Sequence, residues 1–475
     1  MARRKIKIGL VDADLLCNGT RHPNLALLKI AGYFRDNGYV RGITDNSNSY
    51  ELITNESKFE ELQKFDYFYV SCVFTFTVAD PPPVLKTLLN DKKLAKKVRM
   101  GGTGNYANLS VEEGFAEKRE EDMHRLENDV FLKKLKNKSG TNGIDMRTQM
   151  PDYHLYDEFV SVMETVKSSS NYYKDYKKYS IGFLTRGCFR RCSFCVNKLE
   201  RKAMPYSSLK DFLDQERDEK GRLVRPYIYL WDDNFLASPY WERLLDELIA
   251  TGRPFQFRQG LDERLLAQHK RGEDMARKLS SANYHGDFIF AFDNWFDRRL
   301  IEKALKIWKF YCPKKETKFY LFCGFQQTST DDKKFQLDIA EIFMRICVLM
   351  RYGCLGYIMR HEDYKQAPMS NMYVQIARWC NQPGFYRNLS FWEYCYKNQT
   401  YWEEHSLGIK HTRLKSYEEF LEDLDNGYYE DKRICRTLIT CHEFLESHKA
   451  HKKLFLSFFN MSFRKMIDPS LYDRK

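Results

Sequence analysis

The run Gly182-Phe-Leu-Thr-Arg-Gly-Cys-Phe-Arg-Arg-Cys-Ser-Phe-Cys195 follows a short apolar stretch and places three cysteines on one loop. Cys188, Cys192 and Cys195 have the spacing CxxxCxxC, which is close enough for their thiolates to share one metal cluster. Iron-sulfur clusters normally take four cysteine ligands, so three cysteines without a nearby fourth leave one iron for another ligand. An open metal position is typical of catalytic rather than structural metal sites.

This spacing, with Phe194 directly before the last cysteine, resembles the signature of the radical S-adenosylmethionine (SAM) superfamily, in its Fe-S oxidoreductase-like branch with a cobalamin-binding domain. The resemblance implies a 4Fe-4S cluster whose open iron is chelated by the amino and carboxylate groups of SAM. It also implies reductive cleavage of SAM to a 5'-deoxyadenosyl radical that abstracts hydrogen, with a reductant such as flavodoxin or ferredoxin. The substrate and the catalytic residues are not indicated.

A zinc site is the alternative for the same cysteines. Zinc usually takes four tetrahedral ligands from paired CxxC-like units, and neither a second pair nor a nearby histidine follows Cys195. The cysteines after residue 300 show no CxxC spacing and are interpreted as small buried apolar residues.

The composition predicts an enzyme of a reducing, cytoplasmic compartment. A chain of 475 residues predicts two domains with an appendage. Its thirteen cysteines, without a signal-peptide pattern at the start, favour reduced thiols. No apolar run reaches the length of a membrane helix. The net charge of +12 is compatible with an anionic partner, although a solvated basic surface explains it as well.

The first 115 residues alternate apolar, strand-like segments with amphipathic, helix-like ones, as a doubly wound sheet requires. A loop is expected over residues 13–22 and a helix over 24–37, ending at Gly38. Strands are expected over residues 5–12, 66–77 and 98–100, the last ending at Gly101 and Gly102. Paired glycines allow a ligand to approach the backbone closely.

This layout resembles the cobalamin-binding domain that precedes the barrel in many radical SAM enzymes. The resemblance implies that Gly101 and Gly102 are ligand-facing, and that cobalamin would serve a methylation. The Asp-x-His-x-x-Gly sequence of histidine-ligated cobalamin is absent, because His22 has the wrong spacing from Asp12 and Asp14. Cobalamin bound without a histidine and a domain that has lost the cofactor both stay open.

A charge-rich linker is expected over residues 116–176, and from residue 177 short apolar runs alternate with helix-like segments up to residue 363. This pattern matches a partial (β/α)6 barrel. The expected barrel strands are residues 180–184, 227–231, 255–258, 288–292, 319–323 and 355–359. The expected helices are residues 240–250, 262–279, 295–310 and 337–350.

Each barrel strand ends in polar residues, where parallel barrels hold their active sites. The resemblance implies that the cofactor-binding segment Asp232-Asp233-Asn234 replaces the usual Gly-Gly-Glu motif, and that the carboxylate of Asp232 or Asp233 binds the SAM ammonium. It further implies that Asp293 or Asn294 binds the ribose, that the Phe194 backbone orients adenine, and that Gln259 contacts the carboxylate of SAM or substrate. Helix capping is the alternative for any one of these clusters.

The predicted fold class is therefore α/β: a Rossmann-like doubly wound domain, a partial TIM-type barrel and a mainly helical domain over residues 364–475. The last segment is rich in aromatic and basic residues, which suits either a helical core or stacking on RNA. The core is the favoured interpretation. Two further hypotheses are a non-catalytic iron-sulfur or zinc protein that binds nucleic acid, and a degenerate family member that binds SAM without cleaving it.

Overall fold

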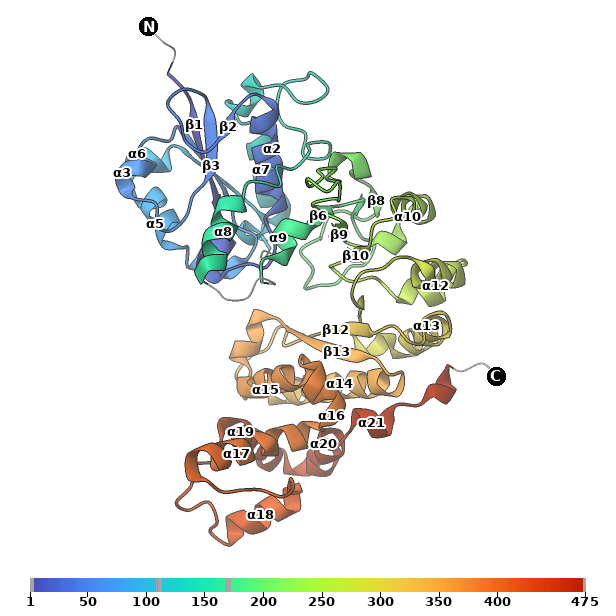
Figure 1. Ribbon diagram of the computed structural model, residues 1–475. Coiled ribbons are helices and arrows are strands. Elements are labelled where there is room, and N and C mark those ends of the chain that lie inside the picture. The colour runs from blue at the N-terminus through green and yellow to red at the C-terminus, as the bar shows by residue number, and fades with distance from the viewer. Residues whose placement is uncertain (1–3, 108, 110–112, 167–171, 473–475) are drawn as a thin grey trace. The chain divides into compact units, whose positions relative to one another are not determined.

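The computed structural model describes residues 4–107, 109, 113–166 and 172–472, and the chain forms two compact units, Met1–Gln259 and Gly260–Lys475 (Figure 1). The fold is mixed α/β with parallel sheets, as the sequence predicts. The boundary between the units lies inside the segment expected to form one barrel domain, so each unit contains some of the predicted barrel strands.

A sheet of five parallel strands begins the first unit, in the order β2-β3-β1-β4-β5. The strands are β1 Lys7–Asp12, β2 Val40–Arg41, β3 Ser49–Leu52, β4 Tyr67–Ser71 and β5 Val98–Gly101. Alternate residues of β1 point to opposite faces, so Ile8 and Leu10 join one core and Val11 joins another. Both faces of the sheet are therefore buried, which explains the nearly continuous apolar run of β1.

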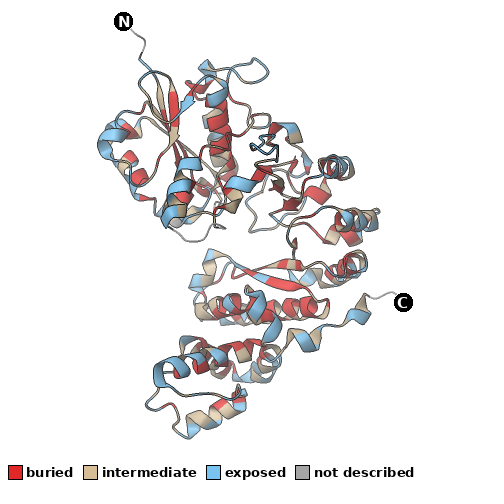
Figure 2. Ribbon diagram, viewed as in Figure 1, coloured by how far each residue is buried: buried red, intermediate tan, exposed pale blue. Residues whose placement is uncertain are grey.

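The helices of this region are α1 Ala13–Asn18, α2 Leu25–Asp36, α3 Phe59–Leu62, α4 Thr75–Ala79, α5 Pro83–Asn90, α6 Lys92–Ala95 and α7 Phe115–Glu127, with 3-10 turns η1 Thr103–Asn105 and η2 Leu132–Lys134. The predicted helix α2 is confirmed. Its N-cap Asn24 accepts a hydrogen bond from the Leu27 N–H, and Gly38 follows its end with φ of 79°. Figure 2 shows α2 as largely buried.

Two predictions for this region are wrong. Residues 13–22 do not form only a loop, because Asp12 accepts the Leu15 N–H and caps the short helix α1. The strand expected over 66–77 ends at Ser71, and residues 75–79 are helical. The Asp14 carboxylate accepts the N–H groups of Val73 (2.7 Å) and Phe74 (3.2 Å), which turns the chain out of the sheet.

The segment expected to be a linker packs against the first sheet. It contains α7, η2, α8 Asp157–Val166 and α9 Lys174–Lys178, and its Leu132, Tyr156 and Val160 join the core of Ile8 and Leu10. A Cβ on Gly32 of α2 would lie 2.0 Å from the Met150 carbonyl oxygen, so only glycine allows this approach. The segment is thus part of the first unit's core.

All six predicted barrel strands are present, as two parallel sheets of three strands each. In the first unit the order is β10-β9-β6, and in the second it is β11-β12-β13. The strands are β6 Tyr179–Gly182, β9 Tyr227–Leu230, β10 Phe255–Phe257, β11 Phe288–Ala291, β12 Thr317–Cys323 and β13 Leu355–Arg360. A separate two-stranded antiparallel pair, β7 Thr185–Arg186 with β8 Met204–Pro205, lies beside the cysteines in the chain.

Between these strands lie α10 Trp241–Ala250, α11 Arg264–Gln268, α12 Gly272–Ser281, α13 Arg298–Tyr311 and α14 Asp332–Arg351, with 3-10 turns η3 Leu209–Asp211, η4 Phe235–Ala237 and η5 Trp295–Asp297. The prediction of a single helix over 262–279 is wrong, because the segment forms two helices, α11 and α12, separated by a turn. A Cβ on Gly272 would lie 2.0 Å from the Leu266 carbonyl oxygen, so the turn brings two backbone segments into close contact.

The regular secondary structure described after β13 is helical. It consists of η6 Glu362–Gln366, α15 Ser370–Cys380, α16 Pro383–Asn388, α17 Phe391–Leu407, α18 Tyr417–Asp425, α19 Arg436–Ser447, η7 Lys449–His451, α20 Lys452–Phe459, α21 Phe463–Met466 and η8 Pro469–Leu471. Trp379, Tyr386, Phe391, Trp392 and Phe459 are buried, so these aromatic residues form the core of the helices. Within the described part of the chain, no helix is long and apolar enough to cross a membrane.

Candidate functional site

The three cysteines lie on the segment that joins β7 to β8 in the first unit, and each is half-buried. The backbone N–H of Cys188 donates to the Glu200 carbonyl (3.0 Å), and that of Cys195 donates to the Cys192 carbonyl (3.0 Å). Gly187 has φ of 100°, and a Cβ there would lie 2.1 Å from the Lys202 carbonyl oxygen. The loop is therefore closely folded on its own backbone.

Hydrogen-bond donors lie at the sulfurs of Cys188 and Cys195. The Sγ of Cys188 accepts from the backbone N–H of Arg190 (3.4 Å) and from Nδ2 of Asn234 (3.3 Å). The Sγ of Cys195 accepts from the backbone N–H of Asn197 (3.4 Å). Donors at sulfur stabilise thiolates, and such hydrogen bonds are among the features that set the reduction potential of iron-sulfur clusters.

The two aspartates that follow β9 contact the chain around the cysteines. Asp232 is buried and accepts the N–H groups of Leu184 (3.2 Å) and Thr185 (2.5 Å) and the Thr185 hydroxyl (2.7 Å). Burial raises the pKa of Asp232 to about 7, against the lowering effect of these hydrogen bonds. Asp233 accepts the Gly187 N–H at 2.7 Å and pairs with the Arg186 guanidinium at 3.1 Å.

The structure brings Asp232, Asp233 and Asn234 to the cysteine loop. Phe194 is half-buried on the loop itself, and Gln259 is exposed after β10. Asp293 and Asn294 follow β11 in the second unit. Burial raises the pKa of Asp293, whose Oδ1 accepts the Phe322 N–H at 3.3 Å.

In the part of the chain that the structure describes, no group of three or more His, Cys, Asp or Glu side chains converges on the position of a single metal ion. A 4Fe-4S cluster makes a different demand, because each cysteine binds its own iron and the sulfurs lie around the cluster. The donor set of three thiols with N–H groups at sulfur fits such a cluster.

The glycines at the end of β5 contact the protein's own backbone. A Cβ on Gly102, whose φ is 118°, would lie 2.2 Å from the Cys72 carbonyl oxygen. The Gly102 N–H donates to Asp122 (2.9 Å), whose carboxylate also lies 3.5 Å from the Cβ position of Gly101. This close packing accounts for Gly102 without a ligand, whereas a Cβ on Gly101 would make an ordinary contact.

Polar side chains of the protein also meet at the neighbouring ends of β1 and β4. The Tyr156 hydroxyl donates to Asp12 (2.7 Å), and Nδ2 of Asn24 donates to the Ser71 hydroxyl (2.8 Å). His22 lies edge-on to the Trp231 ring, with centroids 4.7 Å apart. Burial lowers the pKa of His22 to about 4, and the charge of Arg258 lowers it further, so this imidazole is neutral and packed.

The buried Asp12 carboxyl gives the first unit a pH-dependent stability. Burial raises its pKa to about 6, so the folded state holds the proton more tightly than the unfolded chain, where the value is 3.8. Stability is therefore expected to fall as pH rises from about 4 to 7. Between pH 4 and 7, the unfolding free energy of wild type should fall by up to about 3 kcal/mol more than that of the Asp12→Asn variant, which has no carboxyl group to titrate at this position. Urea denaturation measures both values. Parallel pH profiles for the two proteins would contradict the assignment.

Arg345 and Glu263 are buried charged residues of the second unit, and sequence reasoning missed Arg345. Arg345 on α14 donates to the carbonyls of Phe292 (2.9 Å) and Phe322 (3.0 Å), at the ends of two strands. A single arginine on the apolar face of a predicted helix is a signal that could have found it. Glu263 is buried and accepts the Ala291 N–H (3.2 Å), and burial raises its pKa well above the ordinary value.

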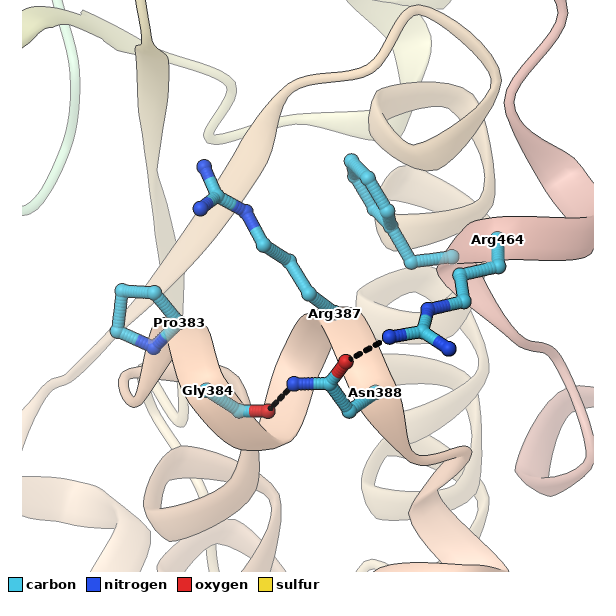
Figure 3. A pocket seen from close by; sticks show the side chains of 6 residues that line it. Pro383, Gly384, Arg387, Asn388 and Arg464 are labelled. Carbon is cyan, nitrogen blue, oxygen red and sulfur yellow. Dashed lines mark hydrogen bonds between the residues drawn. The ribbon is translucent and has the colours of Figure 1, made fainter.

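An open hollow of about 300 Å³ lies elsewhere, in the helical part of the second unit, lined by Pro383, Gly384, Arg387, Asn388, Phe463 and Arg464 (Figure 3). Arg464 donates to Asn388 (2.5 Å), and Arg387 pairs with Glu316. Since both guanidinium groups are already engaged by protein partners, the hollow has no evident chemistry.

The chain matches no family model, and no curated protein is significantly similar to it. The resemblance to radical SAM enzymes therefore depends on the cysteine loop and on the succession of parallel strands and helices around it.

Proposed function

We propose that the protein is a radical SAM enzyme whose 4Fe-4S cluster is held by Cys188, Cys192 and Cys195. The observation that carries the proposal is the donor set: three half-buried thiols on one loop, with N–H donors at the sulfurs of Cys188 and Cys195. Thiolates are the ligands that iron-sulfur clusters prefer, and N–H donors at sulfur are the usual means of tuning them.

When bound and reduced, the cluster would supply the electron that cleaves SAM to a 5'-deoxyadenosyl radical. The chain's own residues would orient SAM. Both carboxylate oxygens of Asp232 accept backbone N–H groups, those of Leu184 and Thr185. Asp233 accepts the Gly187 N–H of the loop through Oδ2. Asp233 is therefore the better candidate for the SAM ammonium, through Oδ1. Phe194 would orient adenine.

The other cofactor contacts remain expectations of the resemblance. Gln259 would contact a carboxylate, and Asp293 or Asn294 the ribose. The proposal treats the six parallel strands as a partial (β/α)6 barrel and the five-stranded sheet as a Rossmann-like domain. The all-parallel pairing of this sheet and the cores on both of its faces support the second assignment. A reducing cytoplasm would suit the cluster and a flavodoxin-like or ferredoxin-like reductant.

No corrinoid step belongs to the proposal, because the residues at the end of the first sheet do not fit cobalamin. The Gly101 and Gly102 backbone packs on Cys72 and Asp122, Tyr156 holds Asp12, and His22 is buried against Trp231. In the described part of the chain, these groups are thus engaged by other residues of the protein. Hydrogen abstraction followed by rearrangement or oxidation would need no methyl carrier.

The test is made on wild-type protein reconstituted with iron and sulfide under anaerobic conditions. We expect a reducible 4Fe-4S cluster whose electron paramagnetic resonance spectrum changes when SAM is added, and 5'-deoxyadenosine release after reduction with dithionite. Protein that takes up zinc in place of iron would contradict the proposal and favour the metal-binding, non-catalytic alternative. A cluster whose spectrum is unaffected by SAM would also contradict it.

A further inference from the structure

The triplet Asp232-Asp233-Asn234 reaches the cysteine loop because β6 and β9 are neighbouring parallel strands. Gly182 pairs with Leu230, so the residues that follow the two strands leave the same edge of the sheet. Asp232 then lies against Leu184 and Thr185, directly before the loop. These contacts join residues about 47 positions apart in the chain.

Asp233 connects the two sides of the loop. Its Oδ2 accepts the Gly187 N–H (2.7 Å), directly before the first cysteine, and Nδ2 of Asn197 (3.4 Å), two residues after the last one. The guanidinium of Arg186 adds an ion pair at 3.1 Å. One carboxylate thus closes the segment that contains all three cysteines, and a loop held closed loses less conformational freedom when it binds a cluster.

Asn234 contacts a ligand sulfur directly. Its Nδ2 lies 3.3 Å from the Sγ of Cys188 and donates to it. Reduction adds negative charge to a cluster and its sulfurs, so a donor at sulfur stabilises the reduced state more than the oxidised state. The donor is therefore expected to raise the reduction potential.

We propose that residues 232–234 act as a second layer around the cluster, in which Asp233 positions the cysteine loop and Asn234 tunes the cluster's reduction potential. The tuning by Asn234 rests on the proposed function. The positioning by Asp233 concerns the protein chain alone.

The positioning role is tested without metal. Arg190 and Arg191 lie on the loop between the first two cysteines and are trypsin sites. In metal-free protein, Asp233→Ala is expected to speed cleavage after these arginines several-fold, as followed by mass spectrometry. The matched control is Asp175→Ala, which removes a carboxylate of the same unit whose ion-pair partner is Arg258. Equal cleavage rates in Asp233→Ala, Asp175→Ala and wild type would overturn the positioning role.

The tuning role of Asn234 is tested by measuring the midpoint reduction potential of the reconstituted cluster. Asn234→Leu keeps the approximate size of the side chain and removes the donor, so reconstituted protein is expected to hold as much iron as wild type at a lower midpoint potential. Asn234→Asp replaces the donor with a charge and should shift the potential in the same direction. Exposed Asn128→Leu is the control. An unchanged potential in both Asn234 variants would overturn the tuning role.

The two failures are distinguishable. Wild-type protein that binds no iron would overturn the proposed function and the tuning role together, whereas the trypsin experiment would still decide the positioning role. If the wild-type cluster responds to SAM, and the Asn234 variants have the same midpoint potential as wild type, only the tuning role is overturned.

Discussion

Replacing Cys188, Cys192 and Cys195 by alanine is expected to abolish the iron-sulfur chromophore and to reduce 5'-deoxyadenosine release to that of a protein-free control. The reason is the proposed ligand count: the three loop cysteines would hold three irons and SAM the fourth, so the loop itself has no spare cysteine. Each single variant should lose most of the cluster as well. Iron and sulfide contents and the visible absorption spectrum measure the loss directly.

The control for this experiment replaces half-buried cysteines outside the loop. Cys17→Ala in the first unit and Cys347→Ala in the second remove a thiol of similar exposure without touching the cluster ligands. Both should keep wild-type iron content and wild-type release. Retention of a full cluster in the triple loop variant would mean that other cysteines hold the metal.

Replacing Arg345 by methionine is expected to destabilise the second unit by about 3–5 kcal/mol. Arg345 is 1% exposed, and its guanidinium donates to the carbonyls of Phe292, Asp293 and Phe322 at 2.9–3.0 Å. Methionine fills part of the space but leaves these carbonyls unsatisfied, and it removes the charge that lowers the pKa of Asp293. Urea denaturation of the full chain, followed by circular dichroism, measures the change.

The matched control is Lys333→Met, which removes a positive charge from an exposed position of the same helix. Its effect should stay within about 0.5 kcal/mol. The double variant Arg345→Met with Asp293→Asn should recover part of the loss, since it removes the carboxylate that is left without its cation. An Arg345→Met protein as stable as the Lys333→Met protein would contradict the role of this guanidinium.

Most of the strands could be predicted from the sequence because they are continuous apolar runs. The six strands that were expected to form a barrel, and β1, β4 and β5, are present near their expected positions. The strands β2 and β3 were missed, because Val40–Arg41 is a two-residue strand with both residues exposed and Ser49–Leu52 is short and polar. The helix α1 was missed because its capping by Asp12 depends on a single hydrogen bond.

The sequence by itself determined the spacing of the three cysteines, the parallel α/β class and the aromatic character of the helical segment, because spacing and periodicity are local properties of the chain. Only the tertiary structure decided what Asp232, Asp233, Asn234 and Arg345 contact. These contacts depend on which strands pair and in which register, and a shift of one residue would turn the side chains to the other face. The pairing of β6 with β9 therefore decides which residues surround the cysteines.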